Sequence, residues 1–389
     1  MLESYKMEQN INIEKEETFD DMNLHDDILR GIYAYGFETP STIQKKAIVP
    51  MINGHDMIAQ AQSGTGKTGT FTIGALQNIE FDKNQPQVLI LSPTRELSIQ
   101  TNKVIQGIGN YTNVTSYACI GGTNMKECVM ELQKGKQIVV GTPGRIYDMI
   151  HRRVLKLHML KMFIIDEADD MLNRGFLEQI KLLLRHIHEN VQICLFSATL
   201  PLDVMNTTEK FMNNPVHILV KKDELTLDGI HQYYISLDHE EYKFDTLCDL
   251  YESMSITQAI IYCNTRQKVE WLSQRLTQMD HEVSCIHGDM HFDKRKSIMN
   301  EFCNGCTRIL ISTDLLARGI DIQQISLVIN YELPNQRENY IHRIGRSGRF
   351  GRKGVAINFI TPREVAKAID IEKYYHTEIK ELPADLNTL

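Results

Sequence analysis

The sequence has no excess of basic residues, because 42 Lys and Arg are outnumbered by 50 Asp and Glu and the formal net charge is −8. A bulk positive field that holds nucleic acid is excluded, so any nucleic acid must bind at a local or gated site. No apolar run approaches the ~18 residues of a membrane-spanning helix. The first eighteen residues are acidic and polar and lack the basic and apolar segments of a secretory signal. These absences predict a soluble, cytoplasmic protein with no membrane partner.

The sequence also lacks a cysteine framework and has a single tryptophan, Trp271. Several of the eight cysteines, such as Cys194 and Cys263, lie in apolar runs and are expected to be small buried residues. Cys303 and Cys306 form a C-x-x-C, but no second Cys or His pair follows at zinc-finger spacing. The sequence therefore favours buried thiols over a metal site, and it predicts Trp271 to be a core residue.

The 389 residues exceed the ~250 to 300 at which one hydrophobic core stops growing, so two domains are expected. Each half contains five short β-rich apolar runs with helix-period stretches between them, which predicts parallel sheets covered on both faces. The fold class is thus two tandem doubly wound α/β domains, at 1–220 and 230–389, joined by a short polar linker at 221–229. The predicted strands are 57–61, 88–91, 138–140, 162–165 and 193–196, then 259–262, 283–286, 308–311, 327–330 and 355–360.

A glycine-rich stretch, Ala61–Thr68 (AQSGTGKT), follows the first apolar run and precedes a helical pattern. Glycines at 64 and 66 permit a tight turn whose N–H groups, with those of Ser63 and Thr65, face anionic oxygens. Lys67 would meet the β- and γ-phosphates, and the Thr68 hydroxyl would hold Mg²⁺. A chance match in a flexible loop is the alternative, and the strand–loop–helix context favours nucleotide binding.

Acidic residues end the fourth apolar run, where ligands of parallel sheets bind. Asp166 is positioned to hold Mg²⁺, in part through water, and Glu167 to orient the attacking water. A solvated acidic turn is the alternative for this pair alone. The fifth run ends in Ser197-Ala198-Thr199, whose hydroxyls could couple the acidic residues to domain movement.

Basic residues recur in the second half as His342, Arg343, Arg346 and Arg349. Guanidinium groups at this spacing suit a developing phosphoryl charge, so Arg346 and Arg349 are candidate nucleotide-binding and catalytic residues. A basic surface turn is the alternative. Because Lys67 lies in the other half, hydrolysis would require the domains to close.

The string Asp166-Glu167-Ala168-Asp169, together with the motifs above, resembles the DEAD-box ATP-dependent RNA helicases. The resemblance extends from about Thr18 to the last residue and implies two RecA-like domains. Further family motifs match at 93–97, 121–122, 142–145, 264–266, 287–289, 313–314 and 317–321.

The resemblance implies ATP and Mg²⁺ as cofactors and an adenine-reading motif near the N-terminus. In that motif an aromatic ring stacks on the adenine and an amide reads its hydrogen-bonding edge. Asp321 would contact the ribose. The residues that match the adenine motif are Phe19, Gly36, Phe37, Pro40 and Gln44.

The resemblance also implies that each domain has a site that binds the RNA backbone. Hydroxyls, backbone N–H groups and arginines form this site and do not distinguish between bases. Closure of the two domains on the RNA would bend one RNA strand and expel its partner strand. The result is local unwinding of short duplexes. The matching residues are Pro93, Thr94, Arg95, Gly122, Thr142, Gly144, Arg145, Thr265, Arg266, Gly288 and Thr313.

Within the family, stretches such as Phe19–Leu24 and Leu315–Asp321 resemble the helicases of translation initiation. That resemblance implies unwinding of single-stranded or structured RNA in mRNA leaders, by a chain that is monomeric when isolated, with a scaffold factor and a cap-binding protein as partners. Ser347 instead resembles the exon-junction helicases, and an ATP-gated RNA clamp of the exon-junction or rRNA-processing type stays an alternative. A third alternative is a nucleotide-dependent switch that has a phosphate-binding loop but binds no nucleic acid. That alternative would give Thr265 and Thr313 no role.

Overall fold

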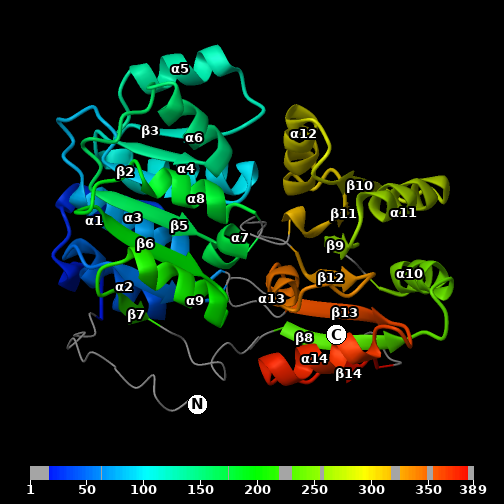
Figure 1. Cartoon of the computed structure of the whole chain (residues 1–389). Helices are drawn as coiled ribbons and strands as arrows, with labels where there is room; N and C mark the ends of the chain where they lie inside the picture. Colours follow the sequence, from blue (N-terminus) through cyan, green and yellow to red (C-terminus); the bar gives the residue numbers. More distant parts are fainter. Residues whose placement is uncertain are drawn as a thin grey trace. The chain divides into compact units, whose positions relative to one another are not determined.

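The computed structural model describes residues 17–62, 64–173, 175–218, 230–254, 258–316, 325–347 and 354–383. The chain forms two compact units, Met1–Val220 and Lys221–Leu389, and each has a seven-stranded parallel sheet within its described residues (Figure 1).

The first sheet has the strand order β3-β4-β2-β5-β6-β1-β7. Because its strands are parallel, the chain returns from the end of one strand to the start of the next through crossover connections that contain helices. The central strands are apolar runs, and alternate residues along each strand point to opposite faces of the sheet. The strands are β1 (Met57–Gln60), β2 (Val88–Leu91), β3 (Ser116–Cys119), β4 (Ile138–Gly141), β5 (Met162–Asp166), β6 (Gln192–Ser197) and β7 (Val216–Ile218).

The two faces of this sheet build two separate hydrophobic cores. In β5, Ile164 packs into one core, while its neighbours Phe163 and Ile165 pack into the other. The first four α-helices cover one face and the remaining five described helices cover the other. The helices are α1 (Asp26–Ala34), α2 (Thr42–Ile52), α3 (Lys67–Asn78), α4 (Arg95–Ile108), α5 (Met125–Gln133), α6 (Pro143–His151), α7 (Ala168–Asn173), α8 (Leu177–Leu184) and α9 (Leu202–Thr208).

The second sheet, with order β10-β11-β9-β12-β13-β8-β14, is also packed on both faces by separate cores. Its strands are β8 (Ile230–Ser236), β9 (Ala259–Tyr262), β10 (Val283–Ile286), β11 (Ile309–Ser312), β12 (Leu327–Asn330), β13 (Gly354–Ile360) and β14 (Lys380–Glu381). Its described helices are α10 (Tyr242–Ser253), α11 (Arg266–Gln278), α12 (Phe292–Cys303), α13 (Glu338–Ile344) and α14 (Val365–Tyr375).

The strand orders of the two sheets correspond position by position, because β3, β4 and β2 of the first stand where β10, β11 and β9 stand in the second. Thr94 caps the helix after β2, and Thr265 caps the helix after β9. Motif residues that are far apart in the sequence are thereby brought to equivalent sheet positions.

The predicted fold class is confirmed, but four strands were missed. β3, β7 and β14 lie at sheet edges, are short, and have half-exposed or polar residues, and β8 pairs next to an edge with only Gln232 fully buried.

The prediction that Trp271 is a core residue is wrong, since it is 37% exposed. Val269, Leu272 and Leu276 form the buried stripe of α11, and Trp271 lies off that stripe, packed edge-on against Phe244. The predicted burial of Cys194 and Cys263 is confirmed.

Candidate nucleotide and RNA sites

Three adjacent strands of the first sheet, β5, β6 and β1, end at the predicted acidic pair, the hydroxyl motif and the glycine loop. β1 leads into the glycine loop, β5 ends at Asp166 and β6 ends at Ser197. Parallel strands present their carboxyl ends at one edge, where ligands of doubly wound sheets bind. We call the ends of these three strands the nucleotide side of the first unit.

The glycine loop has the backbone geometry that a phosphate cradle requires. Gly64 and Gly66 have φ of 85° and 101°, a region that favours glycine, and Gly66 is the N-cap of α3. The backbone N–H of Ala61 donates to the carbonyl of Ser197 at 3.0 Å, which ties the loop to β6. Buried Lys67 donates from Nζ to the carbonyl of Ala61 at 2.8 Å, so its ammonium lies inside the loop.

Gln44 and Phe37 lie beside this loop. Gln44 Oε1 accepts from the Ser41 backbone N–H at 2.8 Å in the capping box of α2, and its Nε2 faces the loop. A methyl group at Gly66 would come within 3.0 Å of that Nε2, and one at Gly69 within 2.8 Å of the Phe37 ring. The amide and the half-exposed ring are therefore close to the start of α3.

Phe19 is placed differently from the expectation that it stacks on adenine. Its ring is fully buried and stacks against Phe37 with 6.5 Å between centroids, while Tyr33 covers it edge-on. A fully buried ring has no open face on which a base can stack. Phe19 therefore packs against Phe37 and supports the position of that ring.

Asp166 and Glu167 form a buried pair of carboxylates at the end of β5. Asp166 Oδ1 accepts from the Glu167 backbone N–H at 2.9 Å, and Glu167 has a left-handed φ of 50°, a strained conformation for a glutamate. Burial, and next the charge of Glu167, raise the pKa of Asp166 above its ordinary value, while Lys67 opposes this shift.

These residues fit a divalent cation. Two adjacent buried carboxylates are oxygen donors whose ionisation costs free energy, and a bound Mg²⁺ offsets that cost. Thr68, in the first turn of α3, adds a hydroxyl on the same side of the sheet.

Asp169 links the acidic motif to β6. Ser197 Oγ donates to Asp169 Oδ1 at 2.8 Å, and Thr199 Oγ1 donates to Asp169 Oδ2 at 2.5 Å. All three residues are buried. The sequence predicted a coupling of these hydroxyls to the acidic motif but did not single out Asp169 as their partner.

On the other side of β5, strands β3, β4 and β2 end in the residues predicted to bind RNA, and we call their carboxyl ends the RNA side of the first unit. Thr94 Oγ1 accepts from the Leu97 N–H at 3.2 Å at the start of α4. The Arg95 guanidinium lies against Gly121, and Arg145 donates from Nη2 to the carbonyl of Thr123 at 3.3 Å. The other predicted residues here are Pro93, Gly122 with φ of 82°, Thr142 as N-cap of α6, and Gly144 in its first turn.

The RNA side of the second unit consists of the equivalent ends of β10, β11 and β9. Thr265 Oγ1 accepts from the Lys268 N–H at 3.2 Å and caps α11. Gly288 follows β10 and Thr313 follows β11, and no described atom lies within 4 Å of a methyl group built at Gly288. Arg266 forms an exposed ion pair with Asp289, so RNA phosphate would compete with that carboxylate.

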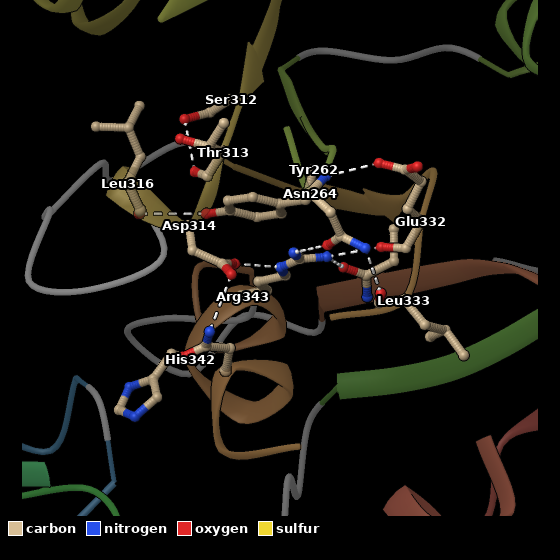
Figure 2. Close-up of polar contacts among 12 residues, drawn as sticks. Tyr262, Asn264, Ser312, Thr313, Asp314, Leu316, Glu332, Leu333, His342 and Arg343 are labelled. Atoms are coloured by element: carbon tan, nitrogen blue, oxygen red, sulfur yellow. Dashed lines mark hydrogen bonds and ion pairs between the residues drawn. The ribbon is translucent and has the colours of Figure 1, made fainter. Parts of the chain in front are cut away.

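Arg343 holds the strand ends of the second unit together (Figure 2). Nε donates to Asp314 Oδ1 at 2.6 Å, Nη2 to Asn264 Oδ1 at 2.8 Å, and Nη1 to Asn330 Oδ1 and the Glu332 carbonyl. Its side chain is fully buried, and Figure 2 shows the His342 ring directed away from this cluster. Arg343 therefore anchors α13 to β9, β11 and β12, a role the sequence did not predict.

Replacement of Arg343 by lysine is expected to destabilise the second unit by about 3 kcal/mol, because an ammonium cannot reproduce four bonds in a planar fork. Trp271 is the only tryptophan and lies in this unit, so its fluorescence during urea unfolding reports this unit alone. Arg337→Lys is the matched control, since Arg337 pairs with Asp370 at an exposed position. Equal unfolding midpoints for the two variants would contradict the anchoring role.

Arg346, the residue after the C-cap of α13, donates from Nε to the carbonyl of His342 in the last turn of that helix at 3.1 Å. Three predicted nucleotide-binding residues, Ser63, Asp321 and Arg349, and the predicted linker at 221–229 lie outside the described residues.

Comparison with known protein families identifies a family domain in each of the two units. Residues 41–208 match the DEAD/DEAH box helicase family, and residues 242–351 match the helicase conserved C-terminal domain. The chain therefore belongs to the DEAD/DEAH box helicases. Within that family, it is similar along nearly its whole length to the eIF4A ATP-dependent RNA helicases.

The ATP-dependent RNA helicase eIF4A of Debaryomyces hansenii is 60% identical over 372 residues, which cover 96% of this chain and 94% of that protein. The eIF4A of Candida albicans is 60% identical over 371 residues, with 95% and 94% covered. Among solved structures, S. cerevisiae Dbp5 bound to RNA and ADP BeF3 has a TM-score of 0.90 at 37% identity, with 95% and 96% covered.

These findings confirm the predicted family, the RecA-like fold and the enzyme class, an ATP-hydrolysing RNA helicase. Among the helices that the structure describes, none combines the length and apolar character that a bilayer crossing requires.

Proposed function

We propose that the nucleotide side of the first unit binds ATP with Mg²⁺ and that the RNA sides of both units bind one RNA backbone. The observation that supports this most strongly is the separation of the two residue sets along the first sheet, with β2 and β5 as the boundary. ATP and RNA can then bind to one unit together, at neighbouring strand ends.

In this proposal the loop N–H groups and Lys67 bind the phosphates, and Thr68 and Asp166 hold Mg²⁺, which neutralises phosphate charge when bound. Glu167 orients and deprotonates the attacking water. Arg346 and Arg349 of the second unit stabilise the developing phosphoryl charge, and Asp321 contacts the ribose. Hydrolysis then depends on closure of the two units, which gates turnover.

RNA binding in this proposal is independent of sequence. The N-cap threonines 94 and 265, the glycine backbone at 122, 144 and 288, and the arginines at 95, 145 and 266 contact phosphates and 2′-hydroxyls. The net charge of −8 provides no general attraction, so affinity depends on closure with ATP.

Gln44→Glu tests the adenine assignment. The substituted carboxylate retains an acceptor for the Ser41 N–H and so preserves the capping box, but it removes the amide donor that faces the loop. We expect ATP affinity to fall on the order of tenfold, with GTP affinity nearly unchanged. Nucleotide titration with fluorescent analogues measures both, and unchanged preference for ATP over GTP would refute the assignment.

We further propose that the chain acts in the cytoplasm, unwinding mRNA leaders during translation initiation with a scaffold factor and a cap-binding protein. Support comes from the relatives named eIF4A, at 60% identity over nearly the full length. The exon-junction alternative rests on Ser347 alone and is not favoured.

A cell-free translation extract depleted of its own initiation helicase tests this role. The chain is expected to restore translation of a reporter with a structured leader and to have little effect on one with an unstructured leader, while Glu167→Gln restores neither. Rescue that does not depend on leader structure, or no rescue, would contradict the proposal.

A further inference from the structure

Two cysteines that the sequence separates by nine positions meet in the first unit. Cys119 is the last residue of the edge strand β3, Cys128 lies in α5, and their Sγ atoms are 3.7 Å apart. A disulfide requires an S–S distance of about 2.05 Å, so bond formation requires the two sulfurs to move closer together. Both thiols are free and buried.

The thiol pair adjoins the RNA side of the first unit. Cys119 precedes Gly121 and Gly122 by two and three residues, and the Arg95 guanidinium lies against Gly121. Arg145 hydrogen-bonds to Thr123 in the connection between β3 and α5, and its guanidinium lies near Cys128 and lowers the pKa of that thiol. A movement of either sulfur is therefore transmitted to the residues proposed to bind RNA.

The surroundings also favour one thiol as a nucleophile. A hydrogen bond from Cys119, and the Arg145 guanidinium, hold the pKa of Cys128 well below its ordinary value. Tyr117 also lies near Cys128 and lowers the pKa of its thiol. Cys128 is buried on the inner face of α5, while Lys126, Glu127 and Met130 of the same helix are exposed, so the helix that carries the thiol lies at the surface of the unit.

We propose that Cys119 and Cys128 form a redox-sensitive pair, which a hydroperoxide converts to a disulfide that weakens RNA binding. The Cys128 thiolate attacks the peroxide and becomes a sulfenic acid, with release of water or the corresponding alcohol. The Cys119 thiol then attacks this sulfur, forms the S–S bond and releases water. Two thiols are oxidised, one peroxide is reduced, and a dithiol such as dithiothreitol reverses the reaction.

The effect on function rests on the proposed function of the RNA side. The disulfide removes the thiolate charge that the nearby Arg145 stabilises, and it draws the β3 end toward α5, which displaces the Gly121–Gly122 backbone. The nucleotide side, at β5, β6 and β1, is separated from β3 by β4 and β2. Oxidation is thus expected to lower RNA affinity on the order of tenfold, the scale of one lost charge-assisted contact, while ATP affinity stays within about twofold.

The test uses the full chain with the exposed Cys303 and Cys306 replaced by serine, so that surface thiols do not contribute. Reduced and hydrogen peroxide-treated protein are compared by peptide mapping under non-reducing conditions, and by affinity for a single-stranded RNA in the presence of a non-hydrolysable ATP analogue. Cys128→Ser in the same background is the matched control, because serine preserves size and cannot cross-link.

We expect a linked 119–128 peptide, weaker RNA binding that dithiothreitol restores, and no oxidation-dependent change in Cys128→Ser. Free thiols at both positions after treatment, or a quantitative disulfide without a change in RNA affinity, would overturn the proposal. Failure of the reduced protein to bind RNA would instead refute the RNA side, while the linked peptide would still show whether the redox pair exists.

Discussion

Lys67→Ala is expected to lower ATP turnover by about 10² to 10³, the cost of losing one preorganised donor to a developing phosphoryl charge. ATP affinity should fall on the order of tenfold to a hundredfold, because a charge-assisted hydrogen bond contributes roughly 1.5–3 kcal/mol. The ammonium is buried and directed into the glycine loop by its bond to the Ala61 carbonyl. Phosphate release at saturating RNA measures turnover, and calorimetric titration measures affinity.

Lys181→Ala is the matched control for this variant. Lys181 lies in α8, is half exposed and pairs with Glu178, so it has the same charge without access to the loop. Its turnover should equal that of the unmodified chain. Normal turnover in Lys67→Ala, with the control also normal, would show that the glycine loop does not bind the phosphates.

Glu167→Gln is expected to reduce the rate of the hydrolytic step by about 10² to 10⁴, the range typical of a lost general base. ATP binding should be retained or strengthened, because removal of this charge lowers the pKa of Asp166 and leaves that carboxylate ionised for Mg²⁺. Glutamine has the same shape as glutamate, so the substitution adds no backbone strain at the φ of 50°. Single-turnover hydrolysis with RNA separates this step from product release.

The control here is Glu178→Gln, an exposed carboxylate in the same unit. It should hydrolyse ATP at the unmodified rate. A wild-type single-turnover rate in Glu167→Gln would exclude Glu167 as the base, and loss of ATP binding in that variant would point to a structural defect.

The local motifs and the central strands could be predicted because each is encoded in contiguous residues. The strand–loop–helix pattern around Gly64, Gly66 and Lys67 is contained in one short stretch of sequence. β5 is apolar up to its last residue, Asp166, because both faces of a parallel sheet are covered. Edge strands carry half-exposed residues, so β3 and β14 gave no apolar run to detect.

The tertiary partners could not be predicted, since they join residues from separate crossovers. Arg343 was grouped by sequence with the arginines that suit a phosphoryl charge, yet its four bonds connect it to strand ends up to 79 positions away. No sequence pattern pairs Cys119 with Cys128, and only the packing of α5 on β3 brings their sulfurs together. Phe19 is a similar case, because its burial depends on the position of Phe37 after α1.

The most direct test of the central claim is steady-state ATP hydrolysis by the purified chain without nucleic acid, with single-stranded RNA, and with DNA of the same sequence. Recognition of the RNA backbone through 2′-hydroxyls, coupled to closure of the two units, predicts strong stimulation by RNA and little by DNA. Equal rates under all three conditions would leave the nucleotide site intact but contradict an RNA-gated helicase.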